Sequence, residues 1–341
     1  MAAVHMTLQE IAKRANVSTA TVSRTINRVP TVNPVLARRV RRVIEKEGYY
    51  PNTHARALAS GQSRILGLLV SEITNPFFPE IVETFAKLGF QHNYEIVLGS
   101  ISQDPRLLAV AVRQMIERRV DGIAILTFGG EDPLIKMFNA RNVSVFAVDR
   151  DCPGPLLRTV RIDYEHGIRE AVQHLAALGH VRIAFIAGPA HLKTAALRKD
   201  AFERCMEEIG LQVPPGLLVE GDHTLQAGVK AISELASLPD RPTAVVCSND
   251  LTAIGVMRQA FELSLNVPRD LSVVGFDDIP LAQFMIPPLT TVQMSQIGIA
   301  SIAFRALLNS TKVQAIETNL VLRCSTTLAP GRLRTVQHSR A

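Results

Sequence analysis

The sequence is poor in the residues that build small covalent or metal-held scaffolds. Its 341 residues contain no tryptophan, and the four cysteines are far apart and form no CxxC pair: Cys152, Cys205, Cys247 and Cys324. Disulfide scaffolds and zinc sites need cysteines at close, regular spacing. The spacing argues against both, and it favours reduced, buried thiols in a cytoplasmic protein that binds no metal.

Long apolar segments are missing as well. No apolar run approaches the roughly 18 residues of a membrane-spanning helix, and the start MAAVHMTLQE lacks the features of a signal peptide. We therefore expect a cytoplasmic protein with no membrane partner. Hydrophobic residues make up 47% of the chain and charged residues 20%, a balance typical of globular proteins. The length suits two or three compact units.

The common catalytic motifs are also absent. There is no glycine-rich phosphate loop, no metal-ligand spacing and no GxSxG elbow. Asp277-Asp278 could be read as an acid/base pair, and His191 or His223 as a catalytic base. Adjacent residues at one strand end point in different directions, however. We therefore expect a protein that is no enzyme and needs no cofactor.

Positive charge is confined to the start of the chain. Residues 1–64 hold 11 Lys and Arg against 3 Asp and Glu, whereas the rest holds 26 basic against 28 acidic residues. The net charges are therefore +8 and −2. A short basic module on a nearly neutral body suits the neutralisation of DNA phosphates. It also argues against a stand-alone sugar-binding transport protein, which would carry an export signal and no basic head.

The basic module has the pattern of two short helices around a tight turn. Thr7 and Glu10 form a capping box, and apolar residues follow at helical spacing: Leu8, Ile11, Ala12 and Ala15. Asn16-Val17 interrupts this helix. The arrangement predicts the first half of a helix-turn-helix.

Ser18 is placed to cap a second helix over 19–27, which would bury Val22 and Ile26. Its outward side chains would be Thr19, Ala20, Ser23, Arg24 and Asn27. The second helix of a helix-turn-helix enters the major groove with its N-terminus first. Arg24 is long enough to reach a base edge, most naturally O6 and N7 of a guanine.

A third helix is predicted over 34–47, buried through Val40 and Ile44 and ended by Gly48. It presents four arginines to solvent: Arg38, Arg39, Arg41 and Arg42. Contact with DNA phosphates and a plainly solvated face are equally compatible with this pattern.

The segment 7–27, together with Tyr50-Pro51-Asn52 and 55–58, resembles the head and hinge of the LacI/GalR family of bacterial repressors. The resemblance implies a hinge that becomes helical on DNA and wedges a leucine from each of two protomers into the minor groove. It places this wedge at Leu58, beside Arg56 and Ala59. Leu58 could also be ordinary core, but 61–63 (Gly-Gln-Ser) favours a linker. Leu36-Ala37 departs from the family pattern and puts one phosphate contact in doubt.

The DNA-contacting residues that follow from this reading lie in the two helices and the hinge. They are Leu8, Ser18, Thr19, Ala20, Thr21, Ser23, Arg24, Asn27, Arg56, Leu58 and Ala59.

From Ile65 onward, short apolar strands alternate with helical stretches. Strands are predicted at 65–70, 95–98, 122–126, 145–148, 183–186, 244–247 and 272–274, with helices at 79–91 and 105–118. Continuous Val/Ile/Leu strands covered by helices indicate doubly wound parallel sheets. They are too many for one compact sheet. We therefore expect an α/β fold with a helical head and a body of two subdomains that face each other across a cleft.

The expected divisions are a head at 1–49, a hinge and linker at 50–64 and a body at 65–341. The first subdomain would comprise about 65–160 and 292–312, and the second about 163–289 and 315–330.

Ligands of open parallel sheets bind at the carboxyl ends of the strands. The residues at these ends that could contact a ligand are Phe77, Phe78, Asp149, Asn249-Asp250 and Asp277-Asp278. Flat apolar faces and several acceptors suit a polyhydroxylated ring, and Arg198 would add paired donors. Each Asp or Asn alone could equally be a helix N-cap.

The family resemblance extends over the body, carried by 162–189, 248–255, 274–280 and 287–292. It implies a body like a periplasmic sugar-binding protein that dimerises and senses an effector. The resemblance places effector contacts at Phe77, Phe78, Asp149, Arg198, Asn249 and Asp277. At His223 many relatives carry a stacking aromatic, which suggests an effector other than a common hexose.

The expected partners are a near-palindromic operator in double-stranded DNA, a carbohydrate-like effector and a second copy of the chain. Whether the effector releases the protein from DNA or fastens it there is left open. The short tail after Pro330 has no leucine heptads, which argues against a tail-driven tetramer.

Overall fold

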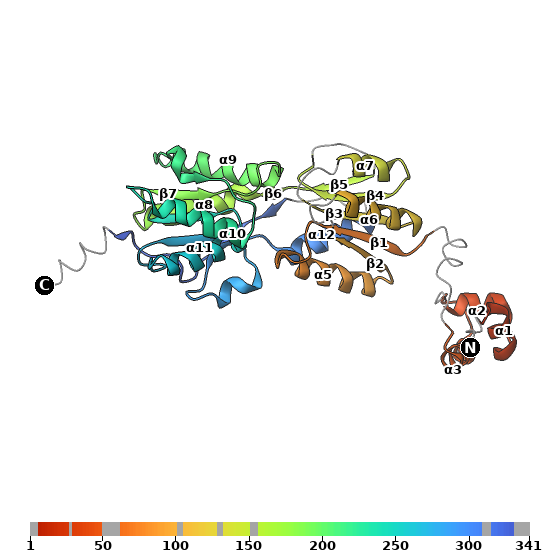
Figure 1. Ribbon diagram of the computed structural model, residues 1–341. Helices are drawn as coiled ribbons and strands as arrows, with labels where there is room; N and C mark the ends of the chain where they lie inside the picture. The colour runs from red at the N-terminus through yellow and green to blue at the C-terminus, as the bar shows by residue number, and fades with distance from the viewer. Residues whose placement is uncertain are drawn as a thin grey trace. The chain divides into compact units, whose positions relative to one another are not determined.

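The computed structural model describes residues 6–26, 29–49, 62–100, 105–127, 132–150, 156–308 and 315–330. The chain divides into two compact units, Met1–Ser63 and Arg64–Ala341. The first is helical, and the described part of the second contains two large β-sheets with helices on their faces and one two-stranded sheet (Figure 1). The predicted α/β fold class with a helical head is confirmed.

The head consists of three helices, α1 (Leu8–Ala15), α2 (Thr19–Ile26) and α3 (Pro34–Glu47). The predicted capping box is confirmed: the Thr7 hydroxyl accepts from the Glu10 amide at 3.3 Å, and the Glu10 carboxylate accepts from the Thr7 amide at 2.6 Å. The Ser18 hydroxyl accepts from the Thr21 amide at 3.2 Å, and Gly48 ends α3 at φ 59°. Local sequence signals therefore define all three helices.

One small core joins the three helices. Val22 of α2 and Val40 of α3 have no exposed surface, and they pack with residues of α1: Ile11, Ala12 and Ala15. Ile26 and Ile44, predicted to be buried, are half-buried at the margin of this core. The face of α2 opposite Val22 remains available to solvent.

The first sheet of the body has five parallel strands in the order β2-β1-β3-β4-β5. The strands are β1 (Ile65–Val70), β2 (Glu95–Ser100), β3 (Gly122–Leu126), β4 (Ser144–Val148) and β5 (Leu157–Val160). Successive side chains alternate between two covered faces. Leu66 and Phe146 pack toward α5 (Phe77–Gln91) and α12 (Gln296–Leu308). Ile65 and Val145 pack toward α6 (Pro105–Glu117) and α7 (Asp132–Asn139).

The second sheet has six strands in the order β13-β11-β10-β9-β7-β8, with only β13 antiparallel to its neighbour. The strands are β7 (Ile183–Ile186), β8 (Leu218–Val219), β9 (Ala244–Cys247), β10 (Ser272–Asp277), β11 (Thr290–Gln293) and β13 (Asn319–Val321). Between them lie the short 3-10 helices η1 (Pro215–Leu217) and η2 (Pro280–Phe284).

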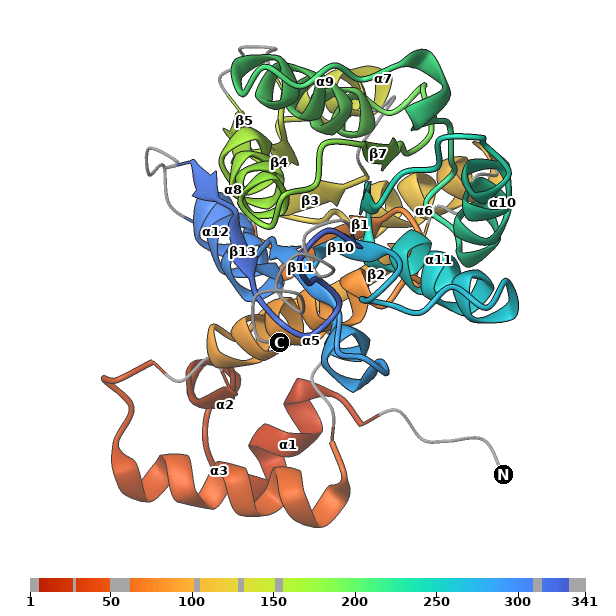
Figure 2. The same cartoon turned by 90° about the vertical axis from the view of Figure 1, so that its left-hand side faces the viewer.

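Helices cover both faces of the second sheet. Phe185 and Val246 pack toward α8 (Tyr164–Ala177) and α9 (Lys193–Glu208). Ala184 and Val245 pack toward α10 (Leu225–Ala236) and α11 (Asp250–Glu262). The α8–α9 and α10–α11 pairs lie on either side of the sheet in Figure 2. Coverage on both faces explains why these strands read as continuous apolar runs.

Three crossovers join the sheets. The first crossover passes through β6 (Ile162–Asp163), and the second joins β11 to α12. The third passes through β12 (Ile316–Glu317), which pairs with β6 of the first. Val292 and Gln293, expected in the first subdomain, belong to β11 and hence to the second sheet. The crossover begins after Gln293, because backbone pairing with β10 and β13 continues to this residue.

Several element ends differ from the predictions. α5 begins at Phe77 rather than at residue 79, since the Asn75 carboxamide accepts from the Phe77 amide at 3.0 Å. β2 and β10 run to Ser100 and Asp277 because the neighbouring strands continue to pair with them. The short strands β5, β6, β8, β11, β12 and β13 were not predicted.

The buried thiols of Cys205 and Cys247 agree with the sequence analysis, whereas Cys324 is exposed, since it follows β13 at the edge of the sheet. Cys152 lies outside the described residues. Within the described parts of the chain, no helix has both the length and the apolar character needed to cross a membrane.

Candidate functional site

A cleft of about 740 Å³ opens between the carboxyl ends of the two sheets. From the first sheet, the segment after β1 contributes Asn75, Phe77 and Phe78 to its wall. From the second come residues at the starts of helices and at strand ends: Thr194, Arg198, His223, Asn249 and Asp277. Six of the seven predicted effector contacts thus meet at one cleft.

Four helices begin at this cleft, and side chains that precede three of them accept hydrogen bonds from amides of the first turn. Asn75 accepts from the first turn of α5, Thr224 from the Ala227 amide of α10, and Asn249 from the Thr252 amide of α11. The alternative reading of Asn249 as an N-cap is therefore correct. Its amide nitrogen also donates to the carbonyl of His223 at 3.0 Å, so the one side chain both caps α11 and lines the cleft.

Arg198 and Asp277 form the charged part of the wall. Both are buried, at 4% and 5% exposure, and Nη2 of Arg198 lies 3.6 Å from Oδ1 of Asp277. Nη1 of Arg198 donates to the Ser248 carbonyl at 2.5 Å, while Nε has no partner among the described residues. A buried N–H without a partner is costly, so Nε is an unsatisfied donor behind this wall.

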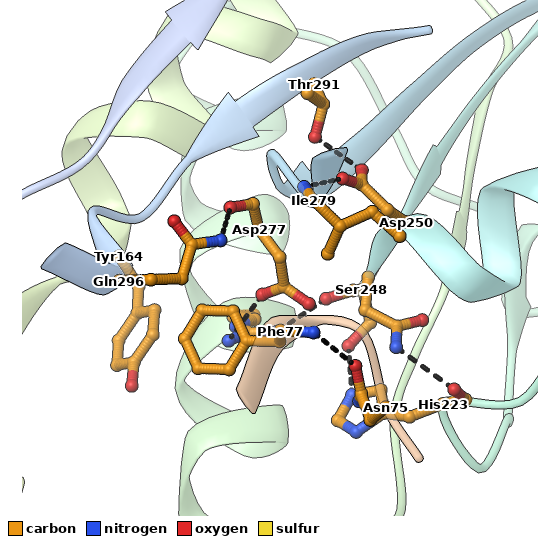
Figure 3. A network of polar contacts seen from close by, with 12 residues as sticks. Asn75, Phe77, Tyr164, His223, Ser248, Asp250, Asp277, Ile279, Thr291 and Gln296 are labelled. Carbon is orange, nitrogen blue, oxygen red and sulfur yellow. Dashed lines mark hydrogen bonds and ion pairs between the residues drawn. The ribbon is translucent and has the colours of Figure 1, made fainter. Parts of the chain in front are cut away.

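The Asp277 carboxyl is held away from water. Burial raises its pKa to about 7, although the Arg198 guanidinium acts in the opposite direction. Its backbone has φ 110°, an uncommon value for a residue with a side chain, and its carbonyl accepts from the Gln296 carboxamide at 3.0 Å (Figure 3). The carboxyl can thus accept from a ligand hydroxyl when ionised and donate to one when protonated.

His223 is neutral at physiological pH. Burial, followed by the charge of Arg198, lowers its pKa to about 3. Its Nε2 lies 2.7 Å from the Ser248 hydroxyl, and its ring rests against Gly188, where a Cβ would lie 1.9 Å from Nε2. The absence of a side chain at Gly188 therefore lets the imidazole pack into the wall as a fixed, uncharged polar group.

The structure does not bring Asp149 to the cleft wall. Its Oδ1 accepts from the Ile162 amide at 2.9 Å, and its Oδ2 from the Tyr164 hydroxyl at 2.8 Å. The first crossover runs directly past the end of β4, so its backbone and side chains occupy both carboxylate oxygens. Asp149 is therefore a junction residue in this structure.

Asp277 and Asp278 do not form an acid/base pair. The Asp278 carboxylate accepts from Arg323 at 2.6 Å and from Gln293 at 2.8 Å, away from the cleft. The Asp250 carboxyl accepts from the Thr291 hydroxyl and the Ile279 amide, and burial raises its pKa. Among the described residues, no group of three His, Cys, Asp or Glu could hold a metal ion.

The sequence analysis missed part of the cleft wall. Further lining residues are Ser71, Glu72, Thr74, Thr127, Pro189, His191, Leu192, Thr194, Asp222, Thr224, Leu225, Gln226 and Leu251. Most of them follow predicted strands, so the rule about strand ends could have found Ser71 and Thr127. The group around Asp222 could not be found in this way, because the two-residue strand β8 has no clear sequence signal.

On the head, the predicted DNA contacts within the described residues lie at the start of α1 and along α2. Leu8, Ser18, Thr19, Ala20 and Arg24 are exposed, and the smaller side chains Thr21 and Ser23 are half-buried. The predicted contacts Asn27, Arg56, Leu58 and Ala59 lie outside the described residues. A solvent-facing helix with small side chains at its start and a long cation near its end fits a groove.

Comparison with known proteins identifies both parts of the chain. Residues 7–52 match the model of bacterial regulatory proteins, lacI family, and residues 172–332 match a periplasmic binding protein-like domain. Catabolite control protein A of Priestia megaterium is 31% identical over 319 residues, covering 93% of this chain and 96% of the relative. The transcriptional repressor CytR of Escherichia coli (strain K12) is 32% identical over 333 residues, covering 95% and 97%.

Solved structures agree with these matches. The lac repressor dimer bound to operator and the anti-inducer ONPF superposes with a TM-score of 0.82 at 27% identity, covering 94% of this chain and 99% of that one. The transcriptional regulator CelR in complex with cellobiose gives a TM-score of 0.69 at 29% identity, with the same coverage. The chain belongs to the lacI family of bacterial regulatory proteins, whose members regulate genes rather than catalyse reactions.

Proposed function

We propose that this protein is a sequence-specific DNA-binding repressor whose affinity for its operator is set by a small effector in the body cleft. One observation carries the proposal: a capped helix-turn-helix head and a polar cleft lined by Arg198 and Asp277 occur in one chain. The head supplies readout of DNA and the cleft supplies a ligand-dependent change of state.

On the DNA side, α2 provides direct readout. The exposed Arg24 would contact a base edge, while Thr19 and Ala20 at the start of α2 allow the backbone to approach the groove. Ser18, Thr21 and Ser23 would position the helix on the phosphates. The hinge residues Arg56, Leu58 and Ala59 would complete the contact by kinking the central step, as inferred from the family resemblance.

In the cleft, we propose a neutral, carbohydrate-like effector. Donors of Arg198 and the carboxyl of Asp277 line one wall, and a pair of ligand hydroxyls could bond to both groups. Phe77 and Phe78 add apolar ring surface from the first sheet. CelR has been solved with cellobiose, which supports a carbohydrate here. His223, which belongs to the expected effector contacts, lines the same cleft, and we propose that it contacts the effector as well.

The chain would act as a homodimer on a near-palindromic operator, because two identical heads read two equivalent half-sites. The lac repressor, which shares the fold, has been solved as a dimer on its operator. We further propose that the protein acts in the bacterial cytoplasm, where the DNA is, and has no catalytic activity. The diverging carboxyl groups of Asp277 and Asp278 support the last point.

Selection of bound duplexes from a random DNA pool, repeated at two salt concentrations, tests the proposal directly. We expect a near-palindromic motif with a flexible central step at both salt concentrations. Absence of any motif at either salt, with and without a panel of neutral pentoses, hexoses and disaccharides, would contradict sequence-specific repression. The same operator then serves as the probe with which sugars that alter binding are identified.

A further inference from the structure

Tyr164 lies between the cleft and the first crossover, although it does not itself line the cleft. It is the first residue of α8, directly after β6, and only 4% of its surface is exposed. Its ring and its hydroxyl have different partners on two sides. The ring faces Arg198, which lines the cleft, and the hydroxyl faces Asp149, at the end of the first sheet.

The ring of Tyr164 helps to hold the Arg198 guanidinium in one orientation. The Cζ atom of Arg198 lies 5.1 Å from the centre of the Tyr164 ring and 4.1 Å from that of Phe276. The two rings are 6.1 Å apart and tilted by 39°. Cations bind favourably to aromatic faces when water is excluded. A displacement of Arg198 toward a ligand must therefore displace the Tyr164 ring or lose this contact.

The hydroxyl of Tyr164 joins the second sheet's layer of helices to the first sheet. It donates to Oδ2 of Asp149, which follows β4, while Oδ1 of the same carboxylate accepts from the Ile162 amide in the crossover. The carbonyl of Asp149 accepts from Nζ of Lys193 at the start of α9. Asp149 therefore connects β4, the first crossover and two helices of the second subdomain.

On the proposed function, in which an effector contacts Arg198, we propose that Tyr164 is a positioning residue that couples Arg198 in the cleft to Asp149 at the crossover. Ligand contact that moves the guanidinium shifts the ring, and the shift changes the bond between the hydroxyl and Asp149. The hydrogen bond from Ile162 to the same carboxylate changes with it. Coupling of this kind acts equally in both directions.

The coupling can be measured without an effector. The Ile162 amide reports on the junction because its hydrogen bond to Asp149 slows exchange with solvent. In the full-length protein, Arg198→Lys should keep the charge, lose the planar contact with the rings and speed exchange at Ile162 about tenfold. In the Tyr164→Phe background, which keeps the ring and removes the hydroxyl, Arg198→Lys should change the exchange rate less than twofold. If the effects of Arg198→Lys and Tyr164→Phe on the exchange rate differ from additivity by this amount, Arg198 acts on Ile162 through the Tyr164 hydroxyl.

Tyr94→Phe is the matched control, since it also removes a tyrosine hydroxyl from the body. The Tyr94 ring packs on Phe304, in the first subdomain, and in this background Arg198→Lys should still speed exchange about tenfold. Equal effects of Arg198→Lys with and without the Tyr164 hydroxyl would overturn the proposal, as would no effect at Ile162 in any background. Operator selection with the unaltered protein tests the proposed function separately, so either idea can fail alone.

Discussion

Replacement of Asp277 by asparagine should stabilise the body at pH 8 and have little effect at pH 4. Burial raises the pKa of Asp277 to about 7 in the folded chain, whereas an unperturbed aspartate has a pKa of about 3.9. The folded chain therefore holds this proton more tightly than the unfolded chain. Its stabilising effect is complete below the unfolded pKa and is lost as the pH rises through the folded pKa.

The size of the effect follows from the two pKa values. Their difference corresponds to about 4 kcal/mol, so the unaltered protein should lose up to this amount between pH 4 and pH 8. Asparagine has nearly the same shape and stays neutral at every pH, so the variant should escape the loss. When Asp277 is protonated, Arg198 has no anionic partner. The folded pKa of about 7 already includes the attraction of Arg198 for the ionised carboxylate. The loss of this ion pair in the asparagine variant is therefore already part of the difference between the two pKa values.

Urea unfolding followed by circular dichroism from pH 4 to pH 8.5 measures this difference. The unfolding midpoint of Asp277→Asn should exceed that of the unaltered protein at pH 8, and the two curves should meet near pH 4. Asp200→Asn removes the same charge from an exposed position on α9 and serves as the control. If Asp277→Asn and the unaltered protein showed parallel pH dependence, the pKa of Asp277 would be the same in the folded and the unfolded chain, and the argument would be wrong.

Three further predictions concern the head and hinge. Arg24→Ala should cost about 1–3 kcal/mol of discrimination at one base pair, measured by titration of operator variants; a uniform loss on every sequence would make Arg24 a phosphate contact. Leu58→Ala should weaken operator binding much more than binding to a random duplex, and equal losses on the two DNAs would reject the wedge. Thr7→Ala should destabilise the head by about 1 kcal/mol, seen as faster amide exchange in α1, because it removes the hydroxyl that accepts from the Glu10 amide; unchanged exchange would show that the cap adds no stability.

Much of the fold could be predicted because local signals and burial agree. The capping box at Thr7, the proline and glycine that bound α3, and the apolar strands covered on both faces all have strong sequence patterns. Strand ends then located part of the cleft wall, since parallel strands bring their carboxyl ends to one edge of the sheet. This rule points to the polar residues Asn249 and Asp277, where the family resemblance also places effector contacts.

The remaining parts depend on contacts between distant segments. Asp149 stands at a strand end like the others, but the first crossover brings Ile162 and Tyr164 onto its carboxylate. The sequence does not show which strand end is covered by a crossover and which is open. Two-residue strands such as β8 are held only by their neighbour in the sheet, so the cleft residues that follow it were missed.

The sign of the effector's action depends on the arrangement of the two subdomains as well as on the residues of the cleft. The backbone carbonyl of Asp277 accepts a hydrogen bond from Gln296 at the start of α12. Helix α12 packs on α5, and the first residues of α5 line the opposite wall of the cleft. On the proposed function, effector contact at Asp277 would therefore depend on how the two subdomains are arranged, and the arrangement would depend on the effector. A ligand shifts such an equilibrium only by its difference in affinity for the two arrangements, and a shift from 1:99 to 99:1 requires a ratio of about 10⁴. The choice between induction and corepression is therefore made by the arrangement of the subdomains that lets a hydroxyl pair reach Arg198 and Asp277 together.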